Sequence, residues 1–165
     1  MRLAHGDLLM SDSILVNTST ELETDGLGRR LAVRLFPGAV IGLVGPLGAG
    51  KTRLVRAIAS GLDIADARVV NSPTFVLIQE YAARLPIYHF DAYRLKSDAE
   101  FLDLGAHEYF GGQGVCLIEW ADRVASCLPD DRLTIAIEIT GATSRRFHLT
   151  AGGPRHQAIV LTAEA

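Results

Sequence analysis

The sequence predicts an α/β sandwich whose central sheet is partly parallel and partly antiparallel. Predicted strands alternate with helices in the first half of the chain and cluster towards its end, which is typical of sheets that mix both directions. A glycine-rich segment, residues 45–52, joins an all-apolar run to an amphipathic one. The 165 residues suit one domain over residues 1–165. Residues 1–10 could form a loose N-terminal extension, because Met10 is an alternative start.

The first half of the chain supplies the elements around the glycine-rich segment. Residues 13–16 predict a short strand, and leucines at helical spacing predict a helix over residues 21–35. Residues 39–44 are all apolar, as in a strand buried on both faces. Residues 51–60 place their apolar side chains on one helical face. The glycine-rich segment therefore connects a buried strand to an amphipathic helix.

The second half of the chain is richer in strands. Strands are expected at residues 75–81, 87–90, 115–118 and 133–139. Short helices are expected after a cap at Ser97 or Asp98 and over residues 122–127. Residues 147–150 and 159–162 are expected to pair as a terminal hairpin.

Composition excludes several classes of protein. A net charge of −3 argues against binding to nucleic acid by bulk charge alone, although a local basic patch remains compatible with it. Cys116 and Cys127 form neither a disulfide framework nor a zinc motif, and they suit a reducing cytosol. No apolar run reaches the ~20 residues of a membrane helix, and the start lacks a signal-peptide pattern. We therefore expect a cytoplasmic protein outside the membrane.

Residues 45–52 fit the pattern G-x-x-x-x-G-K-[ST], in which each part serves phosphate binding. Glycines let the backbone curl so that several N–H groups point at one anion. The helix that begins at Lys51 directs its positive dipole end at the same point. Lys51 adds a charge for the β and γ phosphates, and the Thr52 hydroxyl can ligate Mg²⁺. This predicts a P-loop NTPase-like fold that binds ATP, the alternative being an ordinary glycine turn.

Nucleotide contacts are expected from the loop and from two later segments. The loop residues are Gly45, Leu47, Gly48, Ala49, Gly50, Lys51, Thr52 and Arg53. Ser72 and Thr74, in a Ser-Pro-Thr-Phe segment, could sense the γ phosphate as switch loops do. A plain Ser-Pro turn explains them equally well. Trp120 is a further candidate, with simple packing as its alternative.

Two carboxylates follow predicted strands, at the edge where ligands of open α/β sheets bind. Asp91 is a candidate Mg²⁺ ligand together with Thr52, its alternatives being a helix cap or an ion pair with Arg94. Glu119 could orient the attacking water or support the metal, its alternative being a surface carboxylate. Lys51, Glu119 and Asp91 are thus the predicted catalytic residues, and Thr52, Asp91 and Glu119 the predicted metal site.

Two other features have open interpretations. His89 is expected to be a satisfied, half-buried histidine rather than a catalyst. Arg145 and Arg146 form a basic pair that suits either a solvated sheet edge or a contact with phosphate or a partner.

The order of GPLGAGKT, SPTF, HFDAYRL and IEWADR resembles the TsaE (YjeE) family of small bacterial ATPases. The segment TDGLGRRLA is similar to that family's T-x-x-L-G-x-x-L-A helix, so the resemblance runs from about residue 24 to residue 146. It implies weak ATP hydrolysis in tRNA threonylcarbamoyladenosine biosynthesis, with TsaD and TsaB as partners and tRNA reached through the complex. TsaD carries the transfer to adenosine 37 of tRNA.

The resemblance also implies roles for particular residues. Lys51 and Thr52 would hold phosphate and Mg²⁺, Asp91 would be the Walker-B-like acid, and Glu119 and Trp120 would form the family's E-W motif. One position departs from the family, which usually has Asp where this chain has Pro46. Proline lacks an N–H and fixes φ, but residues 47–51 supply most of the phosphate-facing amides, so binding is expected to survive.

Three other functions compete with a partner-stimulated ATPase. A P-loop small-molecule kinase would need an acceptor pocket and a lid that carries arginine, and residues 98–114 contain no arginine. A GTP-driven switch would need a guanine-reading N-K-x-D motif, which the sequence lacks. A noncatalytic ATP-sensing adaptor would depend on Lys51 and not on Glu119.

Overall fold

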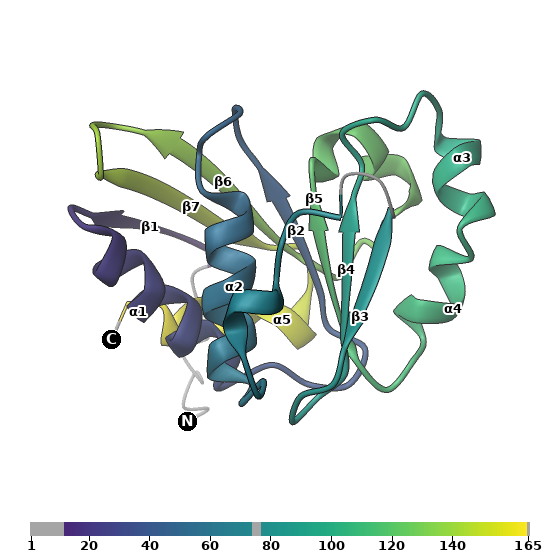
Figure 1. Cartoon of the computed structure of the whole chain (residues 1–165), viewed down its shortest axis with the longest axis horizontal. Coiled ribbons are helices and arrows are strands. Elements are labelled where there is room, and N and C mark those ends of the chain that lie inside the picture. Colours follow the sequence, from purple (N-terminus) through teal and green to yellow (C-terminus); the bar gives the residue numbers. More distant parts are fainter. Residues whose placement is uncertain (1–11, 74–76, 165) are drawn as a thin grey trace, which may run out of the picture.

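The chain folds around one sheet with the strand order β1-β7-β6-β2-β5-β4-β3 (Figure 1). The computed structural model describes residues 12–73 and 77–164. The strands are β1 (Ser13–Thr18), β2 (Val40–Val44), β3 (Ile78–Tyr81), β4 (Ile87–Asp91), β5 (Val115–Glu119), β6 (Leu133–Ile139) and β7 (Arg145–Ala151). The helices are α1 (Glu21–Ala32), α2 (Lys51–Gly61), α3 (Asp98–Asp103), α4 (Ala106–Phe110) and α5 (Pro154–Thr162), with 3₁₀ turns at Ala67–Val69 and Ala121–Cys127.

The sheet is mixed, which confirms the predicted fold class. β2 pairs in parallel with β5 and β6, and β5 pairs in parallel with β4. β3 is antiparallel to β4 at one edge, and β7 and β1 run antiparallel at the other. The carboxyl ends of β2, β4 and β5 therefore meet at one edge of the sheet, where open α/β sheets bind their ligands.

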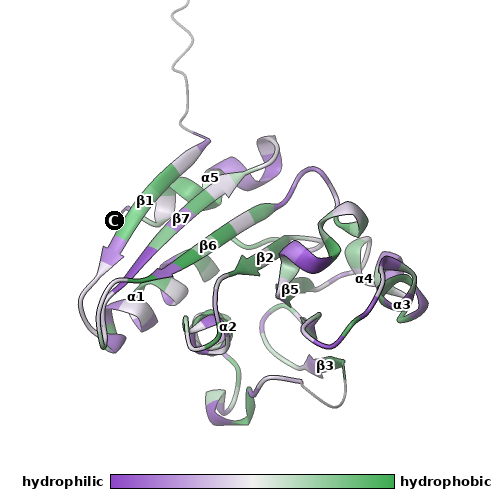
Figure 2. Cartoon of the chain, turned by 90° about the horizontal axis from the view of Figure 1, so that it is seen from above, coloured by the Kyte–Doolittle hydropathy of each residue, from purple (hydrophilic) through white to green (hydrophobic). Residues whose placement is uncertain are grey.

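Helices cover both faces of the sheet, and alternate residues of the central strands fill two cores. Leu117 of β5 joins a core made with α1, α2 and α5. Cys116 and Ile118 join a second core made with α3, α4 and the turn Ala121–Cys127. Figure 2 shows the hydrophobic colour along β2, which both cores bury. The prediction of a strand buried on both faces is thus confirmed.

Glycines allow α1 and α2 to pack closely. A Cβ on Gly28 would lie 2.4 Å from Ala57 Cβ, and one on Gly61 would lie 2.6 Å from Ala32 Cβ. Thr20 caps α1, because its side chain accepts a hydrogen bond from the Glu23 N–H at 3.2 Å. The close packing of α1 against α2 holds α2, and with it the first turn at Lys51, in a fixed position.

The prediction of a terminal hairpin was wrong. Residues 159–162 belong to α5, in which Pro154 occupies the first turn and Ile159 and Val160 are buried. β7 instead pairs with β6 and β1. Proline suits the first helical turn, because the N–H that it lacks has no partner there, and this signal outweighs the β propensity of Ile and Val.

Other boundaries moved by smaller amounts. α1 ends at Ala32 rather than residue 35, and α4 was not predicted. The described part of the strand expected at residues 75–81 is β3, Ile78–Tyr81. Residues 75 and 76 lie outside the described residues, as does Thr74.

Candidate functional site

The glycine-rich loop follows β2 and leads into α2, as its sequence predicts. Gly48 and Gly50 have φ of +80° and +98°, which residues other than glycine rarely adopt. A Cβ on Gly45 would lie 2.8 Å from the carbonyl oxygen of Ile137 in β6. Both the curvature of the loop and its packing on the sheet therefore require glycine.

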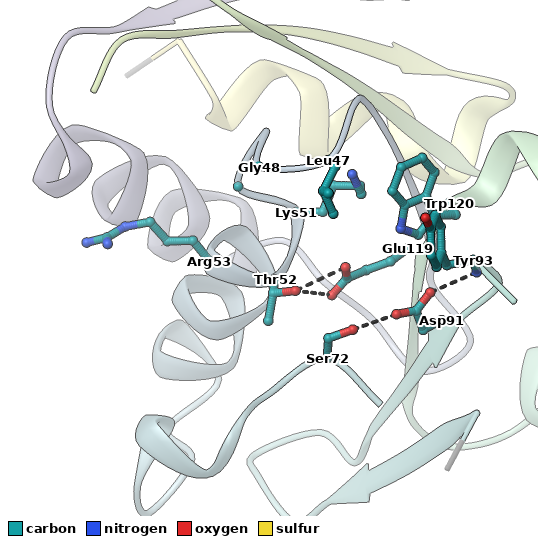
Figure 3. A pocket seen from close by; sticks show the side chains of 11 residues that line it. Leu47, Gly48, Lys51, Thr52, Arg53, Ser72, Asp91, Tyr93, Glu119 and Trp120 are labelled. Atoms are coloured by element: carbon teal, nitrogen blue, oxygen red, sulfur yellow. Dashed lines mark hydrogen bonds between the residues drawn. The ribbon is translucent and has the colours of Figure 1, made fainter. Parts of the chain in front are cut away.

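A cavity of about 410 Å³ lies beside this loop, at the carboxyl edge of the parallel strands (Figure 3). The residues that line it come from the loop, from α2, from the ends of β4 and β5 with the segments after them, and, for Ser72, from the segment between α2 and β3. They are Leu47, Gly48, Gly50, Lys51, Thr52, Arg53, Ser72, Asp91, Tyr93, Glu119 and Trp120. The fold thus brings together most of the residues that the sequence predicted.

Lys51 is held inside the loop that precedes it. Its Nζ donates hydrogen bonds to the carbonyl oxygens of Gly45 at 2.7 Å and Pro46 at 2.8 Å, and lies 3.9 Å from the ring centroid of Trp120. Burial lowers the pKa of the ammonium group, and the nearby carboxylates of Glu119 and Asp91 offset part of this effect. A desolvated ammonium bound only to neutral carbonyls and a ring face is well placed to receive an anion.

Glu119 at the end of β5 connects α2 to β4. The Thr52 hydroxyl donates to Glu119 Oε1 at 2.8 Å and to Oε2 at 3.0 Å. His89 Nε2 lies 2.8 Å from Oε1, and because a carboxylate accepts, the ring nitrogen donates. Glu119 is 3% exposed and His89 is fully buried, so the alternative of a surface carboxylate is wrong. His89 Nδ1 is buried without a hydrogen-bond partner among the described residues.

Asp91 at the end of β4 is the register partner of Glu119 across the parallel pair β4–β5. Its Oδ2 accepts a hydrogen bond from Ser72 Oγ at 2.5 Å, and its Oδ1 accepts one from the Tyr93 N–H at 2.8 Å. Ser72 thus lies at the carboxylate as well as at the cavity, although it comes from a segment far earlier in the chain.

Aromatic side chains form one wall of the cavity. Trp120 has φ of +57°, in the left-handed region, directly after Glu119. Its ring packs against Tyr93 in a tilted arrangement, with centroids 4.8 Å apart and the ring planes at 43°. The guanidinium of Arg123 lies 5.2 Å from the Tyr93 ring centroid. The left-handed turn therefore places an aromatic ring beside the Lys51 ammonium.

Arg53, Ala49 and Gly45 are the predicted contacts that the structure places least directly, and Gly45 is absent from the lining of the cavity. The Arg53 guanidinium points away from the cavity (Figure 3) to pair with Asp25 at 2.8 Å and Glu21 at 2.9 Å. Ala49 is buried and does not line the cavity. Nucleotide contacts by these three residues remain predictions.

The oxygen donors around Thr52 suit a magnesium ion. Mg²⁺ prefers oxygen ligands and usually takes one or two carboxylates together with phosphates and water. The Thr52 hydroxyl and Glu119 are in direct contact, and Asp91 lies on the neighbouring strand at the same level. Within the described ranges, no group of three or more His, Cys, Asp or Glu side chains is arranged to hold a metal without other ligands.

Comparison with known proteins agrees with this geometry. A family model described as threonylcarbamoyl adenosine biosynthesis protein TsaE matches residues 18–147. The chain belongs to the TsaE family. Among TsaE relatives, the tRNA threonylcarbamoyladenosine biosynthesis protein TsaE of Bacillus subtilis is 46% identical over 136 residues, 82% of this chain and 84% of the relative. The TsaE protein of Treponema pallidum is 46% identical over 113 residues, 68% of this chain and 82% of the relative.

The fold of a solved structure also matches that of this TsaE chain. The crystal structure of Bacillus subtilis YdiB superimposes with a TM-score of 0.78 at 37% identity, covering 92% of this chain and 94% of that one. The family serves the biosynthesis of threonylcarbamoyladenosine in tRNA. In the parts of this TsaE chain that the structure describes, no helix is long and apolar enough to cross a membrane.

The sequence did not predict two contacts of the site residues, that of His89 with Glu119 and that of Tyr93 with Trp120. His89 was expected to be a satisfied, half-buried histidine rather than a catalyst, but it is fully buried, and of its two ring nitrogens only Nε2 has a hydrogen-bond partner among the described residues. It lies two residues before Asp91 on one strand and therefore on the same face. That spacing could have identified it. Tyr93 carried no signal, because its packing against Trp120 joins two separate loops.

Proposed function

We propose that this TsaE chain binds Mg-ATP and hydrolyses it slowly during formation of threonylcarbamoyladenosine in tRNA. The convergence of Lys51, Thr52, Asp91 and Glu119 on one cavity beside the loop supports this proposal most strongly. An ammonium, a hydroxyl and two carboxylates at this edge are the groups that phosphoryl transfer requires.

Binding would use groups that already face the cavity. The backbone amides of the loop and the start of α2 would surround the phosphates. Lys51 Nζ would exchange the carbonyls of Gly45 and Pro46 for phosphate oxygens, which offer it stronger charge-assisted hydrogen bonds. Trp120 would keep water from one side of the ammonium.

Thr52, Asp91 and Glu119 would hold the magnesium ion, directly or through water. When bound, Mg²⁺ neutralises charge on the β and γ phosphate oxygens. Ser72 would keep Asp91 in position through the hydrogen bond to Oδ2. Because Ser72 lines the cavity and contacts Asp91, we propose that it responds to the γ phosphate.

Glu119 is the residue that would orient and deprotonate the attacking water. It belongs to a rigid strand, and His89 and Thr52 fix both of its oxygens. A carboxylate held in this way keeps its direction while the water is lined up with the phosphorus atom.

Turnover by the isolated chain is expected to be slow, because none of the described residues gives the cavity a free arginine. Of the described arginines, Arg53 alone lines the cavity, and Asp25 and Glu21 engage its guanidinium. We propose that TsaD and TsaB, the partners that the family resemblance implies, complete the site and carry tRNA to the complex. The two free cysteines are compatible with a cytoplasmic location.

Titration with Mg-ATP tests the nucleotide proposal. At a concentration 100 times the dissociation constant, the ligand should stabilise the fold by about 2.7 kcal/mol. The stabilisation should vanish in Lys51→Ala and persist in Lys96→Ala, which changes the chain's other lysine at an exposed position. Equal stabilisation of wild type and Lys51→Ala contradicts the proposal.

Hydrolysis is measured on the same proteins, alone and with TsaD and TsaB. The expected result is slow turnover alone and faster turnover in the assembly. Turnover of the isolated chain at ordinary kinase rates, about 1–100 per second, contradicts the partner-completed site.

A further inference from the structure

Arg145, at the start of β7, donates hydrogen bonds to backbone carbonyls of the phosphate loop. Its Nε donates to the carbonyl oxygen of Ala49 at 2.9 Å, and its Nη2 donates to that of Gly48 at 3.1 Å. Its Nη1 donates to the carbonyls of Gly141 at 3.0 Å and Ser144 at 2.8 Å in the turn that precedes β7. The guanidinium thus ties two loop carbonyls to two carbonyls of a turn at the sheet edge.

These contacts lie beside a second, smaller hollow of about 180 Å³, which Arg145 and Ala49 line together with Glu21, Thr24 and Thr143. Gly48, Gly50 and Arg53 line both this hollow and the nucleotide cavity. Neither Arg145 nor Ala49 lines the cavity that holds Lys51 and Glu119. Arg145 therefore contacts the backbone of the loop and is not among the residues that line the nucleotide cavity.

The direction of a carbonyl fixes the direction of the amide beside it. In a trans peptide the C=O and the N–H point to opposite sides. When Arg145 holds the Ala49 carbonyl outwards, the Gly50 N–H points inwards, towards the phosphate cavity. The Ala49 N–H, across the peptide from the Gly48 carbonyl, donates to the Pro46 carbonyl at 3.1 Å and closes the turn of the loop.

The loop needs such an anchor because glycine leaves its peptides free to rotate. Gly48 and Gly50, on either side of Ala49, both adopt positive φ. Glycine populates positive and negative φ about equally, so the loop sequence alone leaves both directions of these peptides open. A peptide turned the other way would present an oxygen to the phosphates in place of an N–H.

We infer that Arg145 is a positioning residue that preorganises the phosphate loop for anion binding. Its guanidinium donates to neutral carbonyls alone, and within the described residues no carboxylate forms an ion pair with it. A planar guanidinium can hold four oxygens in one fixed arrangement, which a lysine cannot. Preorganised donors bind an anion without a cost in reorganisation at the moment of binding.

The neighbouring arginine supplies a matched control. Arg146 points to the other face of β7, where it pairs with Glu138 at 3.2 Å and donates to Asn17 at 3.2 Å. Arg146 has the same charge as Arg145 and is its neighbour on the same strand, but it does not contact the phosphate loop. A comparison of Arg145→Met with Arg146→Met therefore separates the effect of losing the hydrogen bonds to the loop from the general effect of losing an arginine on β7.

The experiment measures the dissociation constant of Mg-ADP by calorimetry and the melting temperature of the nucleotide-free protein. Arg145→Met should weaken Mg-ADP binding at least fivefold, while Arg146→Met binds like the wild type. Arg145→Lys keeps the charge but cannot hold four carbonyls, so its affinity should also fall. It provides the same comparison if Arg145→Met does not fold.

The inference rests on the proposed function, and the two can fail separately. If the wild type does not bind Mg-ADP, the proposed nucleotide site is wrong and the inference falls with it. If wild type and Arg146→Met bind while Arg145→Met or Arg145→Lys binds as tightly, only the inference is overturned. A lower melting temperature with an unchanged dissociation constant would likewise assign Arg145 a purely structural role.

Discussion

The Thr52 hydroxyl donates to both carboxylate oxygens of Glu119, at 2.8 and 3.0 Å. This contact joins the first turn of α2 to the end of β5, two elements that the loop and the sheet hold in fixed positions. A hydroxyl and a carboxylate that already touch can share one cation with little movement. Thr52, a proposed ligand of the metal, is therefore in direct contact with Glu119, the proposed base.

Glu119→Gln tests the base without changing the size of the side chain. The amide still accepts a hydrogen bond from Thr52 but cannot take a proton from water. Mg-ATP should still bind, because Thr52, Asp91 and the phosphates remain to hold the metal, and single-turnover hydrolysis should fall by a factor of about 10² or more. Glu108→Gln, at an exposed position of α4, is the control. Hydrolysis by Glu119→Gln at the rate of the control would remove Glu119 from the reaction.

His89→Phe tests whether the buried histidine directs Glu119. Phenylalanine fills similar space but cannot donate to Oε1, which His89 Nε2 contacts at 2.8 Å. The turnover number should fall roughly tenfold while the KM for ATP changes little, because a misdirected base affects mainly the chemical step. The free energy of unfolding should fall by about 1–3 kcal/mol, since a buried carboxylate loses a donor.

His89→Gln is the matched variant, because its amide can still donate to Glu119. Its turnover number should exceed that of His89→Phe. If the two variants lose stability alike and both keep wild-type turnover, His89 is a packing residue and nothing more.

The loop and the central strands could be predicted from sequence because their signals are local. The glycine spacing, the all-apolar β2 and the amphipathic α2 each depend on residues close together in the chain. Asp91 and Glu119 followed from one further rule, that parallel strands end at the same edge. Their register pairing agrees with that rule.

The supporting contacts could not be predicted in the same way. Arg145 reaches Ala49 across 96 positions of sequence, and only the strand order β7-β6-β2 brings them together. From the sequence, the pair Arg145 and Arg146 suited either a solvated sheet edge or a contact with phosphate or a partner, and nothing pointed to the carbonyls of the loop. Residues 159–162 were mistaken for a strand because Ile159 and Val160 favour strands in isolation, whereas Pro154 in the first turn and packing of α5 against β7, β6 and α1 favour a helix.

Two glycines of α1 should respond oppositely to alanine. A methyl group on Gly28 would lie 2.4 Å from Ala57 Cβ and 2.9 Å from the Ala57 carbonyl carbon, so α1 and α2 would have to separate. Gly28→Ala should lower the free energy of unfolding by about 1–3 kcal/mol. A methyl group on Gly26 meets only the flexible end of Arg30 at 3.4 Å.

Gly26→Ala should therefore raise the free energy of unfolding by about 0.5–1 kcal/mol, because alanine loses less backbone entropy in a helix. Urea unfolding of both variants measures the difference. Equal effects of the two substitutions would contradict the close contact between α1 and α2.

The stability of the fold should depend on pH through His156. This buried ring accepts a hydrogen bond from the Val40 N–H at Nε2, at 3.1 Å, and its Nδ1 lies 2.6 Å from Asp131 Oδ1. The Val40 contact requires a neutral ring, because a protonated Nε2 cannot accept. Burial lowers the pKa of His156 below its ordinary value of 6.5, and Asp131 offsets part of that effect.

The sign follows from which state binds the proton. As the pH falls through about 6.5, His156 binds a proton more readily in the unfolded chain than in the folded chain. Proton binding therefore stabilises the unfolded state relative to the folded state. The contribution of His156 to the free energy of unfolding should therefore be fully present above that pH and be lost progressively as the pH falls below it. His156→Gln keeps an acceptor for Val40 but cannot titrate, so its stability should change less as the pH falls. His107→Gln, at an exposed histidine of α4, should keep the wild-type dependence. Urea unfolding above and below that pH decides the matter, and identical pH dependence in wild type and His156→Gln would show that another group titrates.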